Sequence, residues 1–217
     1  MTTKHVPMSY PSAPWSLQGF ALLTLHPISV EQARSHVPPS LQIFEVWPGY
    51  TLGGVYLATY ESGSTLQYNE LIVVAALARH SSNHWGACIS HIYVDNPDSV
   101  EGGREIWGLP KELAHFSWQQ GDRPSITVKQ DEQLLCCLTY QNSFNLWRQS
   151  FTGFAFGQHL AQLLWFSAKA IVNPGFSQAT LEIPSTSPFG PLNLGNPWLT
   201  TYLQGLDLTV EAPQVVG

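Results

Sequence analysis

One lysine of the chain, Lys111, stands in a setting that suits carbonyl chemistry. It directly follows Pro110 and has mostly apolar neighbours, namely Ile106, Trp107, Leu109 and Leu113. Burial disfavours the charged form of an amine, so an enclosed lysine could act as a neutral nucleophile that attacks a carbonyl carbon. The alternative is a surface lysine whose stem packs on apolar residues while its ammonium group reaches water. The local sequence leaves both interpretations open.

Other common chemistries find little support in the sequence. His80, His84 and His91 are spread over a strand-rich region without the cysteine or carboxylate spacing of a zinc site. The glycine motifs that bind dinucleotides or phosphates are absent, and so is the Gly-x-Ser-x-Gly motif of serine hydrolases. We therefore expect neither a metal nor an organic cofactor.

The amino-acid composition limits the kinds of molecule that the protein could bind. Of the 217 residues, 11% are charged and 12% aromatic, and the net charge is −6 without a cluster of lysines and arginines. Such a chain favours a packed core over disorder, and it argues against binding to nucleic acid or to an anionic membrane surface. The longest apolar stretch, residues 71–78, is too short to cross a bilayer, and the N-terminus lacks a signal-peptide core. We expect a cytoplasmic protein.

The elements that must position Lys111 are predicted to be strands. Short runs rich in Val, Ile, Tyr, Thr and Leu alternate with turn signals, at residues 54–60, 71–78, 87–94, 125–129, 134–140 and 163–172. A strand is expected at residues 19–25, followed by a short helix with Ser29 as its N-cap. This pattern predicts a single mainly-β domain over residues 1–217, built as a closed or nearly closed antiparallel barrel with a few short helices outside.

Several motifs together resemble the acetoacetate decarboxylase family. They are Tyr93-Val94-Asp95-Asn96, Gly103-Arg104-Glu105, Gly108-Leu109-Pro110-Lys111 and, upstream, Glu61-Ser62-Gly63. The resemblance covers most of the chain. It implies the barrel fold, a homo-oligomer, Lys111 as the lysine that forms a Schiff base with substrate, and Glu61 as the carboxylate of the active site.

Two positions depart from the family pattern. Glu112 stands where the family decarboxylase has a second lysine, and residues 17–20 lack an arginine that the resemblance would place in the active site. If residues 111–113 are extended, Glu112 points away from Lys111; if the backbone turns there, the two could pair and keep the amine charged. The missing arginine makes acetoacetate itself a weaker substrate candidate than the imine chemistry.

Three further residues are candidates for the substrate pocket. Trp107 could wall it and exclude water, or it could be an ordinary core residue. Glu70 could line it from the start of a strand, although an exposed strand end is the favoured alternative. Arg104 could pair with Glu105 to position the segment that carries Lys111. We therefore expect a decarboxylase that acts on a β-keto acid or a related carbonyl compound through an imine on Lys111. An imine-dependent aldolase or dehydratase, and a non-enzymatic barrel that binds an apolar small molecule, remain as alternatives.

Overall fold

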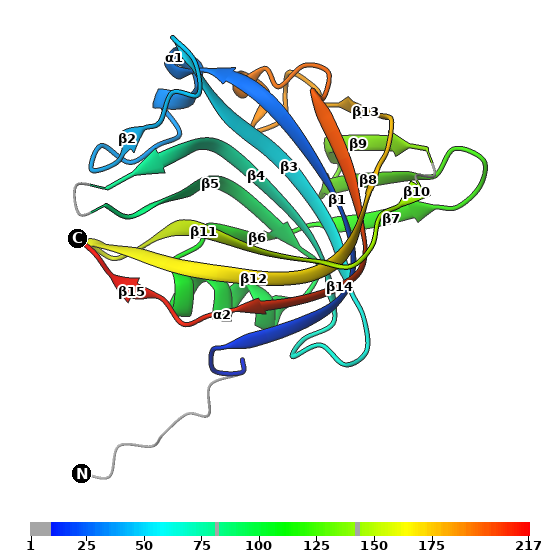
Figure 1. The fold of residues 1–217 in the computed structure, drawn as a ribbon, viewed down its shortest axis with the longest axis horizontal. Coiled ribbons are helices and arrows are strands. Elements are labelled where there is room, and N and C mark those ends of the chain that lie inside the picture. Colours follow the sequence, from blue (N-terminus) through cyan, green and yellow to red (C-terminus); the bar gives the residue numbers. More distant parts are fainter. Residues whose placement is uncertain (1–9, 81–82, 142–143) are drawn as a thin grey trace.

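Long strands wrap into a closed barrel, seen from the side in Figure 1. The computed structural model describes residues 10–80, 83–141 and 144–217, so residues 1–9 of the N-terminus lie outside the described part. Hydrogen-bonded neighbours follow one another around the barrel and close it between β4 and β5. In chain order its strands are β1 (Trp15–Ser29), β3 (Tyr50–Tyr60), β4 (Tyr68–Arg79), β5 (Trp85–Val94), β11 (Gln149–His159), β12 (Gln162–Phe176) and β14 (Leu199–Val210).

The expectation of a mainly-β barrel is confirmed, but the barrel is mixed and not purely antiparallel. Strands β11 and β5 pair in parallel, with Ala155 opposite Ala87 and Phe156 opposite Cys88. After β5 the chain leaves the barrel to form a helix and a separate small sheet, and it re-enters beside β5 in the same direction. Parallel neighbours need such a long crossover, which the short-strand pattern does not reveal.

The remaining strands extend or flank the barrel. Strands β2 (Gln42–Ile43), β6 (Lys111–Leu113), β10 (Phe144–Asn145) and β15 (Gln214–Val215) add to its wall, and β6 pairs in parallel with β5. Strands β7 (His115–Gln119), β8 (Ser125–Gln130), β9 (Gln133–Tyr140) and β13 (Ala179–Glu182) form the small sheet at one side of the barrel (Figure 1).

Two α-helices and a 3-10 turn complete the described elements. Helix α1 (Val30–Arg34) begins as predicted, because the side chain of Ser29 accepts a hydrogen bond from the Gln32 amide. Helix α2 (Pro97–Trp107) was not predicted; Asn96 caps it and Pro97 starts it. The 3-10 turn η1 spans Gly190–Leu192. No helix in the described ranges is both long enough and apolar enough to cross a membrane.

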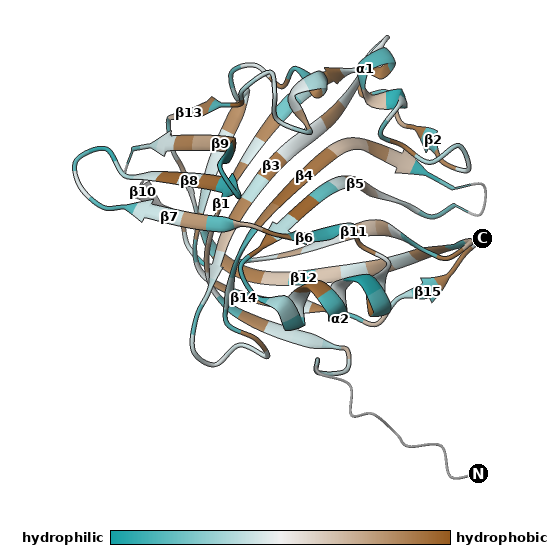
Figure 2. Cartoon of the chain, turned by 180° about the vertical axis from the view of Figure 1, so that it is seen from behind, coloured by the Kyte–Doolittle hydropathy of each residue, from teal (hydrophilic) through white to brown (hydrophobic). Residues whose placement is uncertain are grey.

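Buried side chains gather in two clusters, one on each side of the barrel wall. One cluster, which includes Leu57, Val73 and Leu135, packs the outer face of the barrel against the small sheet. The other includes Trp15 and Phe166 and lies inside the barrel. Figure 2 shows the resulting hydrophobic bands along β1, β3 and β4. Side chains alternate between the two faces of a strand, so each long strand serves both clusters.

His91, whose ring contacts Phe189 of the outer cluster, leads us to predict a loss of stability in mild acid. Burial and the neighbouring His36 lower the pKa of His91 to about 4, against the opposing effect of Glu112. The unfolded chain, with a pKa of 6.5 at this group, binds the proton more readily, so the free energy of unfolding should fall as the pH drops from 6.5 towards 4. Urea unfolding at a series of pH values measures the slope. His91→Gln should flatten it in part, and an unchanged slope would contradict the assignment.

Candidate active site

Lys111 opens strand β6 and points inward, with 4% of its surface exposed. Strand β6 pairs in parallel with β5, and Lys111 lies opposite Ile92. The Arg104 side chain donates a hydrogen bond from Nε to the Lys111 backbone carbonyl, at 2.7 Å. The lysine is therefore held from both sides of its backbone, and the interpretation of Lys111 as a surface residue is wrong.

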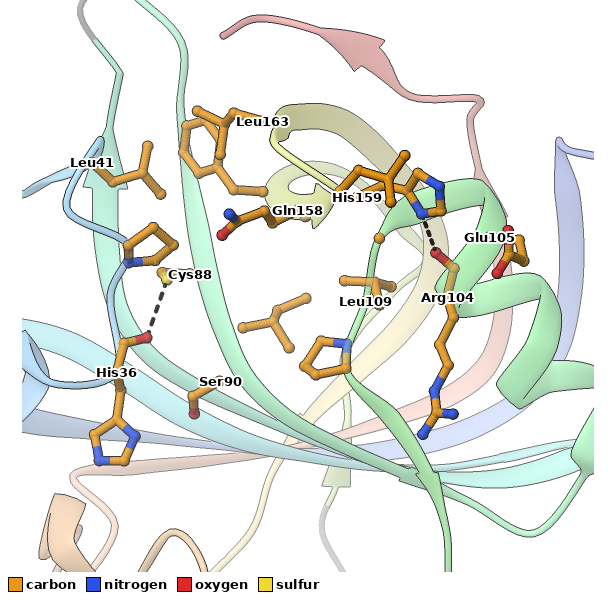
Figure 3. Close-up of a pocket in the computed structure, with 17 residues that line it drawn as sticks. His36, Leu41, Cys88, Ser90, Arg104, Glu105, Leu109, Gln158, His159 and Leu163 are labelled. Atoms are coloured by element: carbon orange, nitrogen blue, oxygen red, sulfur yellow. Dashed lines mark hydrogen bonds between the residues drawn. The ribbon is translucent and has the colours of Figure 1, made fainter.

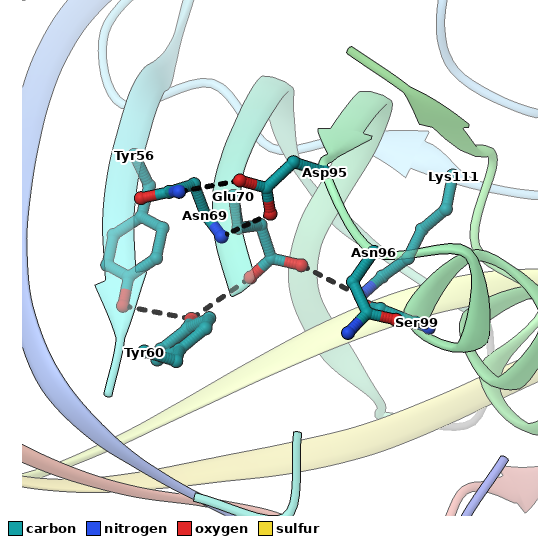
Figure 4. Close-up of polar contacts among 8 residues, drawn as sticks. All are labelled: Tyr56, Tyr60, Asn69, Glu70, Asp95, Asn96, Ser99 and Lys111. Atoms are coloured by element: carbon teal, nitrogen blue, oxygen red, sulfur yellow. Dashed lines mark hydrogen bonds and ion pairs between the residues drawn. The ribbon is translucent and has the colours of Figure 1, made fainter. Parts of the chain in front are cut away.

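The Lys111 amine meets a carboxylate, a hydroxyl and two aromatic rings. Its Nζ lies 2.8 Å from Oε1 of Glu70 and donates to Oγ of Ser99 at 3.0 Å, as Figure 4 shows. The same atom lies 5.0 Å from the ring centre of Tyr68 and 5.7 Å from that of Trp15. The short contact with Glu70 allows a proton to move between carboxylate and amine, which a lysine nucleophile needs.

Two tyrosines continue the polar chain beyond Glu70. The Tyr60 hydroxyl donates to Oε2 of Glu70 at 3.0 Å, and the hydroxyls of Tyr56 and Tyr60 lie 3.3 Å apart (Figure 4). Burial, reinforced by the Glu70 carboxylate, raises the pKa of the Tyr60 hydroxyl well above its usual range. Tyr60 therefore stays protonated and fixes the orientation of the carboxylate.

The Tyr93–Asn96 motif has a structural role beside this site. Both carboxylate oxygens of Asp95 accept hydrogen bonds from Asn69, the residue before Glu70. The Asn96 side chain accepts from the amides of Asp98 and Ser99 and so caps helix α2. One motif thus ties the strand that carries Glu70 to the helix that carries Ser99.

Lys111 and Glu70 line one cavity inside the barrel, with a volume of about 360 Å³, together with the tyrosines Tyr56, Tyr60 and Tyr68. Its wall is otherwise mostly apolar, with residues such as Leu17, Ile92, Phe166 and Leu206. Trp107 lines the cavity as predicted; it is buried, its indole N–H donates to the Glu211 carbonyl at 2.8 Å, and its ring meets that of Trp15 edge-on. Of the described lining residues, only Lys111 is cationic.

The structure corrects the carboxylate assignment. Glu61 follows β3 on an exposed turn, where its amide donates to the Gln18 carbonyl, and it does not line the cavity. Glu70, which was predicted only to line the substrate pocket, is the carboxylate that contacts Lys111. The correction follows from the β3–β4 hairpin: Glu61 belongs to the connection, whereas Glu70 pairs opposite Ala58 inside the barrel wall.

The backbone of residues 111–113 is extended, which is the first of the two alternatives for Glu112. It is exposed and accepts a hydrogen bond from Gln130 at 2.7 Å, so it points away from the Lys111 amine. The replacement of a second lysine by Glu112 therefore leaves the contacts of the Lys111 amine intact. Leu113 is half-exposed at the end of the short strand.

Arg104 lies outside the barrel cavity, so its placement in the substrate pocket is corrected. It lines a separate outer pocket of about 490 Å³ together with His36, Cys88, Ser90 and His159, drawn in Figure 3. Glu105 is also exposed and lines this pocket, so the two do not form a buried pair. Arg104 still positions the segment that carries Lys111, because its side chain donates a hydrogen bond to the Lys111 carbonyl.

A glycine of helix α2 makes room for the side chain of Lys111. A Cβ atom added at Gly103 would overlap with Cδ and Cε of Lys111. Gly103→Ala is therefore expected to displace the amine and to slow its reaction with carbonyl compounds about 10- to 100-fold, since small misplacements of reacting groups cost that much. Reductive trapping of the adduct, followed by mass, measures the rate. Glu105→Ala, at an exposed position of the same helix, is the control; equal rates in both variants would refute the steric argument.

Sequence reasoning missed four residues of the site. Ser99, Tyr56, Tyr60 and Tyr68 carry no motif of their own, although Tyr56, Tyr60, Tyr68 and Glu70 recur at even spacing along two adjacent strands. Even spacing places residues on one face of a strand. The even spacing could therefore have identified the three tyrosines and Glu70 as one group of inward-facing side chains. Among the described residues, no three His, Cys, Asp or Glu side chains converge to hold a metal ion.

Comparison with known proteins agrees with this geometry. The acetoacetate decarboxylase (ADC) family profile matches residues 1–162. Protein NEOXANTHIN-DEFICIENT 1 of Solanum lycopersicum is 34% identical over 117 residues, which are 53% of this chain and 38% of that protein. The protein of the same name from Arabidopsis thaliana is 33% identical over 116 residues, 52% of this chain and 40% of that protein. The match thus spans less than half the length of these plant relatives.

Solved structures share the fold along nearly the whole chain. Acetoacetate decarboxylase from Legionella pneumophila superposes with a TM-score of 0.79 at 18% identity, over 96% of this chain and 89% of that one. The enduracididine biosynthesis enzyme MppR superposes with a TM-score of 0.69 at 12% identity, over 98% of this chain and 91% of that one. With the family profile matching three quarters of its length, the chain belongs to the acetoacetate decarboxylase family.

Proposed function

We propose that this protein is an enzyme that captures a carbonyl compound as a Schiff base on Lys111 and decarboxylates a β-keto acid through that imine. The observation that carries the proposal is the buried amine of Lys111 in contact with Glu70 inside an apolar cavity. Ordinary packing seldom buries both a lysine and a glutamate, and a mostly apolar cavity with a few convergent polar groups is typical of a binding or active site.

Imine formation uses the Lys111–Glu70 contact. Glu70 accepts a proton from the Lys111 ammonium group, and the neutral amine attacks the carbonyl carbon. The protonated Glu70 then returns its proton to the hydroxyl of the tetrahedral adduct, and water leaves. The product is a protonated imine beside the Glu70 carboxylate, so the positive charge that forms has a counter-ion already in place.

Carbon–carbon cleavage follows from the protonated imine. The electron pair of the bond to the carboxylate moves towards the imine nitrogen, carbon dioxide leaves, and a neutral enamine remains. Protonation of the enamine carbon and addition of water then release the ketone and regenerate Lys111. The tyrosine hydroxyls of Tyr60 and Tyr56 continue from Glu70 and offer a path for the protons that these steps require.

Reductive trapping tests the proposal. The protein is incubated with small β-keto acids or ketones and cyanoborohydride, and its intact mass is compared with that of a Lys111→Ala variant. We expect an adduct that depends on Lys111, together with release of carbon dioxide from the keto acids. Absence of an adduct with every carbonyl compound would refute the enzyme proposal and favour a barrel that only binds apolar molecules.

A second candidate is imine chemistry without decarboxylation, such as aldol condensation or dehydration. It is favoured by the lining of the cavity, since no described cation other than Lys111 is available to bind a free carboxylate. MppR, which shares the fold, has been seen in complex with the condensation product of pyruvate and imidazole 4-carboxaldehyde. An adduct that forms with ketones and aldehydes, without carbon dioxide release from keto acids, would select this candidate.

A further inference from the structure

The cavity around Lys111 is larger and more apolar than a small keto acid needs. Its volume is about 360 Å³. An apolar cavity of about 150 Å³ already holds a benzene molecule. Its polar groups are confined to the side of Lys111, Glu70 and the tyrosines, while most of the other lining residues are hydrocarbon. Such a cavity has one reactive end, at Lys111, and an apolar part that extends away from it.

Small side chains create this space on one wall. Ala87 of β5 lies opposite Ala155 of β11, and Gly153 of β11 lies opposite Ala168 of β12. These four residues, with Ala170 further along β12, all line the cavity. The wall of β5, β11 and β12 is therefore recessed at these positions, although Ile92 and Phe166 also line it, whereas the walls of β1 and β14 carry leucines such as Leu17 and Leu206.

The cavity reaches towards solvent at Gly153. This glycine lines the cavity and is exposed, and a Cβ atom added there would meet no other atom within 4 Å. Ala155 is inward-facing and buried two residues further on, so alternation along β11 directs position 153 inward as well. Position 153 thus lies at an open, apolar edge of the same cavity that holds Lys111.

We propose that the carbonyl compound captured by Lys111 carries an extended apolar body, and that this body lies along the recessed wall of β11 and β12 with its far end near Gly153. The inference rests on the proposed imine chemistry and names the substrate class of that site. Burial of hydrocarbon supplies the binding energy, because the wall offers neither charges nor free hydrogen-bonding groups to hold a polar tail.

A homologous series of methyl ketones tests the proposal. Butanone, 2-hexanone and 2-octanone are each titrated with the protein in the presence of cyanoborohydride, and the Lys111 adduct is followed by intact mass. The half-saturating concentration is expected to fall about fourfold for each added methylene, which is the effect of burying one CH₂ group. The decrease should stop once the tail fills the cavity.

Two leucine variants locate the tail. Gly153→Leu places a side chain at the open edge, and should raise the half-saturating concentration of 2-octanone at least tenfold more than that of butanone. Thr152→Leu adds a similar side chain at the neighbouring exposed position, which alternation turns outward, and should keep the dependence on chain length of the unmodified protein.

The outcomes separate this inference from the function on which it rests. Adducts with equal half-saturation for all three ketones would overturn the extended substrate and leave the imine chemistry standing. Indistinguishable behaviour of Gly153→Leu and Thr152→Leu would overturn the placement along β11 and β12. No adduct with any ketone would instead contradict the proposed function itself.

Discussion

Replacing Glu70 by glutamine is expected to slow imine formation on Lys111 by about 10²- to 10⁴-fold, the usual contribution of a positioned acid–base group. The amide keeps the size of the side chain and can still accept the Tyr60 hydrogen bond, but it can no longer take a proton from the amine that lies 2.8 Å from the carboxylate. The measurement is the rate at which the reduced adduct appears at saturating ketone. Folding is checked by the urea midpoint of the same variant.

Glu61→Gln is the matched control for this variant. Glu61 is a glutamate close in sequence, but it is exposed and lies outside the cavity, so its replacement should leave the trapping rate within about twofold, as is usual for surface substitutions. If Glu61→Gln slowed formation of the adduct and Glu70→Gln did not, Glu61 and not Glu70 would be the acid–base partner of Lys111.

The contrast between these two glutamates shows what the sequence could predict about the site. The apolar neighbours of Lys111 left two interpretations open, and the motifs that resemble the acetoacetate decarboxylase family favoured Lys111 as the candidate nucleophile. Its partner depended on which residues of β3 and β4 face each other, and that register is set by the hairpin between them. A short motif such as Glu61-Ser62-Gly63 marks the turn of that hairpin equally well, so the motif alone pointed to a carboxylate that lies outside the cavity.

The fold was also predicted only in part from the sequence. Short runs rich in Val, Ile, Tyr, Thr and Leu between turn signals predicted the strands at residues 54–60, 71–78 and 163–172, because the long strands contribute side chains to both buried clusters. Helix α2 escaped prediction because Gly102 and Gly103 resemble a turn. In the structure a Cβ at Gly102 would overlap the Trp15 ring, and one at Gly103 would overlap Lys111. Those glycines serve close packing, which only the tertiary structure reveals.

Replacing Lys111 by methionine is expected to destabilise the fold by about 3–5 kcal/mol, since it leaves the Glu70 carboxylate buried without its partner. Both side chains of the pair are nearly inaccessible, at 4% and 6% exposed. Adding Glu70→Gln to this variant should recover most of the loss, because the double variant buries no charge and keeps an acceptor for Tyr60. Urea unfolding of the single and double variants measures the coupling between the two sites.

The chain offers a matched ion pair for comparison. Lys169 and Glu211 lie 2.9 Å apart, but their side chains are 59% and 37% exposed. Because water already solvates such a pair, Lys169→Met should cost no more than about 1 kcal/mol. If Lys111→Met were as mild as Lys169→Met, the Lys111–Glu70 contact would not join two charges in the resting protein. The amine would then already be neutral before substrate arrives, and imine formation would begin without the proton transfer to Glu70.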